Sequence, residues 1–247
     1  MLETRHAVSV PSVLQLKVKI YADGADKDAV LALSRNPLIK GFTTNPTLMR
    51  KVGITNYEGF ARDLLLAIPR YPISFEVFAD EPAEMLRQGR KIAGWGENVY
   101  VKIPVTNTRG ESCDAVVREL SHDGIKVNVT ALMTVKQVRT TCAALEGGAP
   151  ACVSVFAGRI ADTGRDPLPI MADSVAIVND VPGVELIWAS PRELLNIFHA
   201  DSVKTHIITV TSDVLTKLNL VGKDLDDYSL DTVKMFANDA AKAGFVL

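Results

Sequence analysis

The chain of 247 residues is 47% hydrophobic, and its 27 basic and 29 acidic side chains leave a formal charge of −2. This size favours one globular domain with a large core, and the balanced charge argues against nucleic-acid or membrane-surface binding, which usually shows as a basic excess. No run of about 18 apolar residues predicts a transmembrane helix. We interpret residues 1–16 as an N-terminal extension of a domain over 17–247.

A short β-branched segment followed by a helical pattern recurs eight times. The expected strands are 17–23, 41–45, 73–78, 99–105, 126–132, 151–158, 185–190 and 206–211. The expected helices are 26–35, 57–68, 81–93, 114–121, 135–144, 166–179, 191–199 and 212–217, followed by an extra C-terminal helix over 230–243. Strict alternation requires parallel strands, and eight units favour a single closed (β/α)8 TIM barrel of the α/β class over an open doubly wound sheet.

Alternation along each strand divides the side chains between the barrel interior and the helix layer. The inward set is Asp23, Ser74, Glu76, Phe78, Tyr100, Lys102, Pro104, Asn128, Thr130, Ser154 and Phe156. The outward set includes the apolar residues between them, with Ala131 and Ala157. Because an unpaired buried charge costs several kcal/mol, inward ionisable groups indicate either chemistry or an ion cluster of Lys102, Glu76 and Asp23 that satisfies itself. Asp23, Asn45 and Ser190 end their strands, which is where barrel active sites lie.

These residues lie in segments that resemble the transaldolase family. The stretch GFTTNPT at 41–47 is similar to the signature G-[VIF]-T-[ST]-N-P-[ST], and VYVKIPVT at 99–106 resembles the Schiff-base lysine strand. The further segments that carry the resemblance are 22–23, 75–77, 128–130, 154–160 and 189–192. It covers roughly residues 17–220, and the length resembles the small branch that includes the fructose-6-phosphate aldolases.

The resemblance implies a role for each catalytic residue. Lys102 would attack the C2 carbonyl of a ketose phosphate and form an imine, for which its amine must be neutral. Asp23 would take the proton of the C4 hydroxyl while the C3–C4 bond breaks. Glu76, with Thr130 and a bound water, would move protons as the imine forms and hydrolyses. Substrate contacts would come from Asn45, Asn128, Ser154 and Phe156.

For the phosphate group, the resemblance points to Arg159, Ser190 and Arg192, since a guanidinium fork suits phosphate oxygens. Alternatives remain open from the residues alone. Arg192 could be a surface arginine in the first turn of a helix, and Asn45 a turn residue ahead of Pro46. Arg165 could be an anion contact, although an exposed loop arginine is the plainer interpretation.

The resemblance implies a transaldolase that acts on sugar phosphates in carbohydrate metabolism, in the pentose phosphate pathway. The alternative is an aldolase-type lyase that releases free dihydroxyacetone. Glu76 and Phe156 favour transfer, because the aldolase branch tends to carry Gln and Tyr there, and a phenol can protonate the enamine. The loop after Thr106 is longer than is usual in the family, which would reshape acceptor specificity at the mouth.

Two other classes fit less well. A barrel that only binds sugar phosphates would not need the inward charges, and a metal-dependent aldolase would need His ligands, whereas the four histidines lack ligand spacing. We therefore expect no metal and no cofactor. The three cysteines have no metal-ligand spacing and predict reduced thiols in a cytoplasmic protein. The family analogy also suggests a homo-oligomer, a pentamer or decamer closed by the C-terminal helix.

Overall fold

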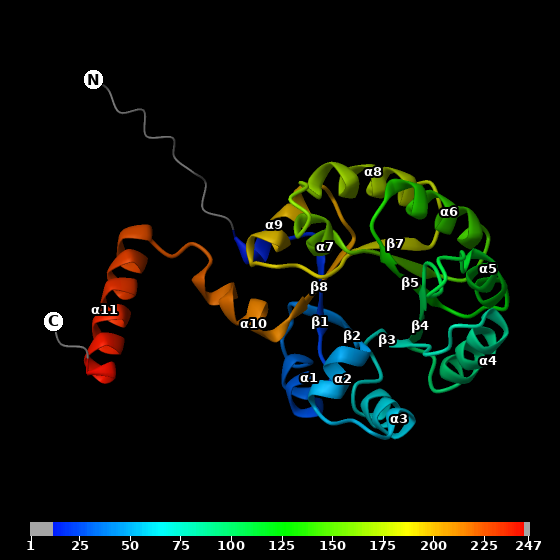
Figure 1. The fold of residues 1–247 in the computed structure, drawn as a ribbon, viewed down its shortest axis with the longest axis horizontal. Coiled ribbons are helices and arrows are strands. Elements are labelled where there is room, and N and C mark those ends of the chain that lie inside the picture. Colours follow the sequence, from blue (N-terminus) through cyan, green and yellow to red (C-terminus); the bar gives the residue numbers. More distant parts are fainter. Residues whose placement is uncertain (1–11, 245–247) are drawn as a thin grey trace.

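The structure, a computed structural model, describes residues 12–244. Its eight parallel strands close into a barrel in sequence order (Figure 1). The strands are β1 (Lys19–Asp23), β2 (Ile39–Thr43), β3 (Ile73–Glu76), β4 (Val99–Pro104), β5 (Val127–Leu132), β6 (Ala151–Val155), β7 (Val184–Trp188) and β8 (Ile207–Thr211). The pairing of β1 with β8 closes the ring. This confirms the predicted barrel and excludes the open sheet. Of the expected extension over 1–16, residues 1–11 lie outside the described residues.

Helices follow the strands around the ring. They are α1 (Lys27–Leu33), α2 (Pro46–Lys51), α3 (Tyr57–Ala67), α4 (Pro82–Ala93), α5 (Asp114–His122), α6 (Val135–Leu145), α7 (Ala157–Ala161), α8 (Leu168–Asn179), α9 (Leu195–Ser202), α10 (Ser212–Leu215) and α11 (Leu225–Ala243). Single 3-10 turns, η1 (Val13–Gln15) and η2 (Thr216–Leu220), precede β1 and follow α10.

Some of the expected boundaries were wrong for local reasons. The short helices α2 and α7 begin directly after strands, so the expected strand over 151–158 ends at Val155. Helix α9 begins at Leu195 instead of 191, because the side chain of Asn196 accepts hydrogen bonds from the backbone of Arg192 and Glu193 and forms a turn there. Helix α11 begins at Leu225 instead of 230, because Asp224 caps it through the amides of Asp226 and Asp227.

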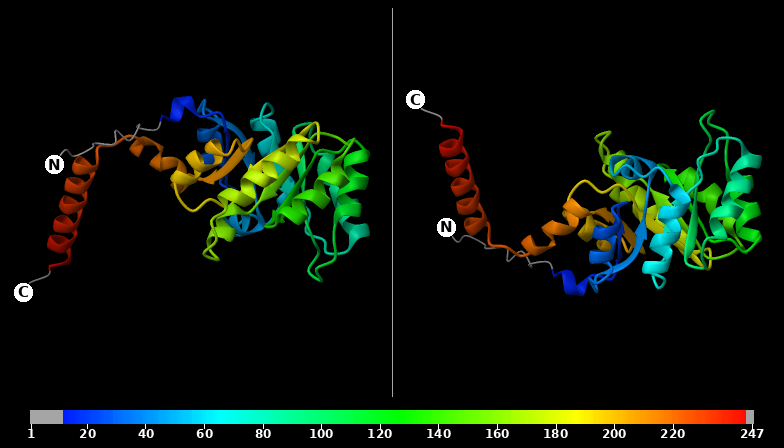
Figure 2. Two further views of the ribbon diagram at one scale, coloured as in Figure 1. Left: turned by 90° about the horizontal axis from the view of Figure 1, so that it is seen from above. Right: turned by 90° about the horizontal axis from the view of Figure 1, so that it is seen from below.

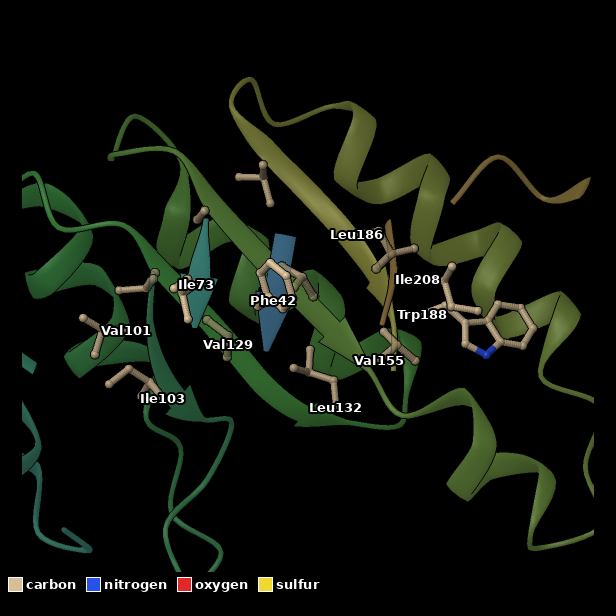
Figure 3. Close-up of a cluster of buried hydrophobic side chains, with 14 of the residues drawn as sticks. Phe42, Ile73, Val101, Ile103, Val129, Leu132, Val155, Leu186, Trp188 and Ile208 are labelled. Atoms are coloured by element: carbon tan, nitrogen blue, oxygen red, sulfur yellow. The ribbon is translucent and has the colours of Figure 1, made fainter. Parts of the chain in front are cut away.

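Two layers of apolar packing hold the barrel. The larger lies between the strands and the helices and contains outward residues such as Phe42, Val101, Leu132 and Trp188 (Figure 3). A smaller cluster fills the barrel interior around Tyr21 and Ile187. The ring of Tyr21 lies over Gly41, where a Cβ atom would meet it at 2.5 Å, so the first glycine of the GFTTNPT segment makes room for this interior packing.

The inward and outward assignments hold except at two strand ends. Ala131 has a φ of 67° beside a register shift in β5, so Leu132 takes the outward core position and Ala131 faces the cavity described below. An irregularity of this kind reverses which side a residue faces. Phe78 lies beyond the end of β3 and is 55% exposed, with its ring packed on Tyr57. The expected inward position of Phe78 and outward position of Ala131 were therefore wrong.

The extra C-terminal helix α11 stands away from the barrel in every view (Figures 1 and 2). None of its residues is buried, and Val233 and Phe236 are 60% and 63% exposed. Over residues 12–244, no helix combines the length and the hydropathy that crossing a membrane requires. The three cysteines are buried and unpaired, as expected.

Candidate active site

A cavity of about 460 Å³ opens at the carboxyl ends of the strands. All eleven side chains expected in the site line it. They are Asp23, Asn45, Glu76, Lys102, Asn128, Thr130, Ser154, Phe156, Arg159, Ser190 and Arg192. They come from the strands β1 to β7 or from the segments that directly follow these strands, so the barrel is what brings them together.

Lys102 lies within β4 and is 8% exposed, so its stem is packed while its amine reaches the cavity. The strand register pairs it with Glu76 on β3 and Asn128 on β5. Its Nζ atom donates to the carbonyl oxygen of Thr44 at 2.8 Å and lies 3.4 Å from Oε2 of Glu76. The amine is thus held at the cavity beside one carboxylate.

Glu76 ends β3, and Tyr57 on α3 fixes the backbone there. The Glu76 amide donates to the Tyr57 hydroxyl at 2.7 Å, and that hydroxyl donates to the Glu76 carbonyl at 3.1 Å. Because the amide and the carbonyl of Glu76 are both hydrogen-bonded to the Tyr57 hydroxyl, the end of β3 is held in place and the Glu76 side chain stays directed at Lys102. Burial raises the pKa of the Tyr57 hydroxyl, which keeps it a neutral donor.

Asp23 ends β1 and is held by two donors. Thr43 donates to its Oδ1 atom at 2.8 Å, and Asn45 donates to Oδ2 at 3.2 Å. Burial raises the pKa of the Asp23 carboxyl above its usual range, against the opposing effects of Lys102, Thr43 and Asn45. A buried carboxylate with a raised pKa is a better proton acceptor than an exposed one.

Asn45 combines the two interpretations that its sequence context left open. Its Oδ1 atom accepts from the amide of Leu48 at 3.0 Å and caps α2, with Pro46 in the first turn. Its Nδ2 group is thereby turned to Asp23. The Asn-Pro turn is therefore the local device that aims the amide into the site.

The amide of Asn128 is fixed at both ends by hydroxyls that face the interior. It donates to Oγ of Ser74 at 3.0 Å and accepts from Oγ of Ser154 at 2.7 Å. All three side chains are buried, and Thr130, two residues farther along β5, is buried beside them. Fixing both ends of the amide holds its orientation on the strand next to Lys102, its register partner.

Arginines gather on the opposite side of the cavity, after β6 and β7. Arg159 lies in α7, with its guanidinium 5.8 Å from the ring of Phe156. Arg192 donates through Nη1 to Oγ of Ser190 at 3.0 Å and binds Asp162 through Nε and Nη2. Asp162 is consequently held with a lowered pKa by Arg192. Because Asp162 offsets one of the two guanidinium groups, this corner of the cavity keeps one net positive charge.

Arg192 precedes α9 instead of lying in its first turn, so the helical part of the alternative interpretation was wrong, whereas its side chain is exposed as that interpretation expected. Arg165 is exposed, donates to Thr163 and is not among the cavity-lining residues. The long loop after Thr106 is tied to the loop after β3, with Arg109 paired to Glu81 at 2.6 Å. Residues 107–112 do not line the cavity either, so the loop is not part of the cavity wall.

Four contributors were missed by sequence reasoning: Ser74, Thr43, Thr209 and Asp162. Ser74 was expected to face inward, and only its partner Asn128 showed that it belongs to the site. Thr43 and Thr209 lie on strands whose inward faces were not assigned, and their contact spans 166 residues. Within residues 12–244, no group of three or more His, Cys, Asp and Glu side chains is arranged to hold a metal ion.

The chain is similar to proteins of one family over most of its length. The family model described as Transaldolase/Fructose-6-phosphate aldolase matches residues 20–247. A protein named "Probable transaldolase" from Thermoanaerobacter sp. (strain X514) is 35% identical over 228 residues, 92% of this chain and 99% of that protein. Another of that name, from Dehalococcoides mccartyi (strain ATCC BAA-2266 / KCTC 15142 / 195), is 34% identical over 202 residues, 81% and 90% of the two chains.

Solved structures share the fold at low sequence identity. One is an HpcH/Hpal aldolase/citrate lyase family protein from Burkholderia cenocepacia J2315, with a TM-score of 0.56 and 16% identity. The match covers 88% of this chain and 95% of that one. At this identity the likeness concerns the barrel alone.

Proposed function

Because the chain belongs to the transaldolase/fructose-6-phosphate aldolase family, we propose that it is a transaldolase. It transfers a dihydroxyacetone unit from a ketose phosphate, such as fructose 6-phosphate or sedoheptulose 7-phosphate, to an aldose phosphate. The observation that carries the proposal is a buried lysine amine in one cavity with two carboxylates, Glu76 and Asp23. Membership of a family leaves the substrate open, whereas an amine beside two carboxylates provides the groups that Schiff-base chemistry requires.

The first stage is formation of an imine on Lys102. The neutral amine adds to the C2 carbonyl of the ketose phosphate, giving a carbinolamine whose hydroxyl leaves as water. The addition releases a proton from the nitrogen. The Glu76 carboxylate, 3.4 Å from Nζ, accepts this proton and then gives it to the leaving hydroxyl. Thr130 lines the same cavity and is suited to hold the departing water.

In the second stage the C3–C4 bond breaks. Asp23 accepts the proton of the C4 hydroxyl, the C4 oxygen forms the aldehyde, and the bonding electrons move into the iminium to give an enamine. An aldose phosphate leaves, and a different one enters and runs these steps in reverse. The raised pKa of Asp23 suits both directions, because its carboxyl holds the proton more readily than an exposed one would.

The phosphate of each sugar lies against Arg159, Arg192 and Ser190. The long axis of the substrate then runs from Lys102 across the cavity to this corner. Asn45, Asn128, Ser154 and Phe156 line the space between and contact the hydroxyls and the carbon chain. The chemistry draws on no metal ion or cofactor, because the iminium itself accepts the electrons.

Release of free dihydroxyacetone is the alternative outcome of the same enamine. Phe156 disfavours it, because this ring borders the cavity and has no proton to give. Acceptor dependence distinguishes the two activities. We expect three-carbon transfer to require an added aldose phosphate, and release of dihydroxyacetone at the same rate without an acceptor would identify an aldolase.

Residues 17–247 are proposed to act as one domain, with 1–16 as an extension, in a cytoplasmic homo-oligomer. The unpaired buried cysteines fit a reducing compartment. The apolar side chains exposed on α11 fit a helix that packs on another subunit, in a pentamer or decamer.

Borohydride trapping tests the proposal. Incubation with fructose 6-phosphate and borohydride should add a reduced three- or six-carbon adduct, detected by intact mass. The Lys102→Met variant should give no adduct, whereas the control Lys126→Met should give the same adduct as the native chain, since Lys126 binds the Glu97 carbonyl and the face of Tyr100. An adduct that survives in Lys102→Met would contradict the assignment.

A further inference from the structure

A chain of hydroxyl groups leads away from the carboxyl of Asp23. Thr43 on β2 donates to Oδ1 of Asp23 at 2.8 Å, and Oγ1 of Thr43 lies 2.6 Å from Oγ1 of Thr209 on β8. Thr43 and Thr209 are 4% and 7% exposed, so little solvent competes for these bonds. The pairing of β8 with β1, which closes the barrel, brings Thr209 near Asp23.

The protonation state of Asp23 fixes the direction of this chain. An ionised carboxylate only accepts, so the single proton of Thr43 must point at Asp23. The oxygen of Thr43 is then left as an acceptor, and Thr209 must donate to it. Once Asp23 has taken a proton, the carboxyl can donate to Thr43, and both hydroxyls can turn to donate the other way without any proton leaving the chain.

We propose that Thr209 is a positioning residue for Asp23, acting through Thr43 to hold the carboxylate oriented and ionised before the C3–C4 bond breaks. This rests on the proposed transaldolase function. A hydroxyl that receives a hydrogen bond becomes a stronger donor, so Thr209 strengthens the bond from Thr43 to Asp23. It contacts neither Lys102 nor Glu76 in the bonds described above, so it should act on bond cleavage and leave imine formation intact.

The charged groups around Asp23 stay the same when Thr209 is changed. Lys102 and Glu76 face it from β4 and β3, and Asp26, Lys51 and Asp213 line a neighbouring cavity that Asp23 also borders. Thr209→Val keeps the shape and removes the hydroxyl. The weakened bond from Thr43 favours the protonated carboxyl, so the acid limb of the kcat/KM profile should move to higher pH.

The test compares Thr209→Val, Thr209→Ser and the control Thr141→Val. Thr141 on α6 is fully buried, and its hydroxyl has no hydrogen-bond partner among residues 12–244. Thr141→Val therefore controls for the replacement of a buried threonine by valine away from the site. We expect Thr209→Val to lose about three- to tenfold in transfer rate, the usual worth of one hydrogen bond, with its acid limb displaced. Thr209→Ser should restore both, and borohydride trapping should be equal in all variants.

Either of two results would overturn the inference. One is a Thr209→Val enzyme with the native rate and native acid limb, and the other is a Thr209→Ser enzyme as impaired as Thr209→Val. If the valine variant does not fold, Thr209→Ala gives the same comparison with a smaller side chain. Absence of a trapped adduct in the native chain would refute the proposed function instead, and the positioning role with it.

Discussion

Gly158 is the position where one added carbon atom should damage both stability and phosphate binding. It lies in α7, directly before Arg159, and packs against the backbone of Ser190 after β7. A Cβ atom at this position would lie 1.6 Å from the Ser190 carbonyl oxygen and 2.7 Å from its carbon, where ordinary contacts begin at 3.4 Å. Ser190 itself has a φ of 60°, a conformation with little freedom to adjust.

The cost of Gly158→Ala follows from which atoms collide. Overpacking costs about 1–3 kcal/mol, and this clash belongs at the upper end because a backbone carbonyl, unlike a side chain, cannot rotate away. The helix gains at most about 1 kcal/mol from replacing glycine by alanine. The net destabilisation is about 2 kcal/mol, which lowers Tm by about 4–8 °C for a chain of this size.

Two measurements check the expectation. Calorimetry should show the drop in Tm, and KM for fructose 6-phosphate should rise about tenfold or more, because Ser190 and Arg159 are pushed apart, with little change for unphosphorylated fructose. Gly94→Ala is the control, since its Cβ would meet Lys91 at an ordinary 3.4 Å and its φ is −70°. A Gly158→Ala chain with Tm within about 1 °C of the native value and an unchanged KM would refute the reasoning.

Three further predictions concern the site and the last helix. Asp23→Asn should lower the transfer rate at least about a hundredfold and yet raise Tm at pH 7, because a carboxyl with a raised pKa destabilises the fold above that pKa. The gain in Tm should vanish as the pH falls below the ordinary pKa range of aspartate, and an equal gain at all pH values would contradict this reasoning. Phe156→Tyr should raise acceptor-independent release of dihydroxyacetone several-fold, measured enzymatically, and an unchanged ratio of release to transfer would argue against the role given to this ring. The proposed packing of α11 on another subunit predicts that Val233→Asp combined with Phe236→Asp lowers the mass measured by light scattering, and an unchanged mass would contradict that packing.

Much of the site was accessible from the sequence because strand residues alternate between two faces. Lys102, Glu76 and Asn128 could be placed together from alternation and from the order of strands in a barrel, and the register confirms them as neighbours. The resemblance of the GFTTNPT segment identified Asn45, although the residues alone left a role in the turn ahead of Pro46 and a role in the site as alternatives. Alternation is a local property, and a local pattern is enough to predict which side chains share a face, whereas the place of Asn45 in the site came from the family resemblance.

Tertiary structure decided what alternation could not reach. The register shift in β5 turned Ala131 toward the cavity, and β3 ended before Phe78, because both depend on how neighbouring strands pair. The bond between Arg192 and Asp162 joins loops that are 30 residues apart, and the bond between Thr43 and Thr209 joins strands 166 residues apart. A single sequence records which side chains each strand carries. The contact of Thr43 with Thr209 exists only after the last strand closes against the first, and that of Arg192 with Asp162 only after β7 has paired with β6.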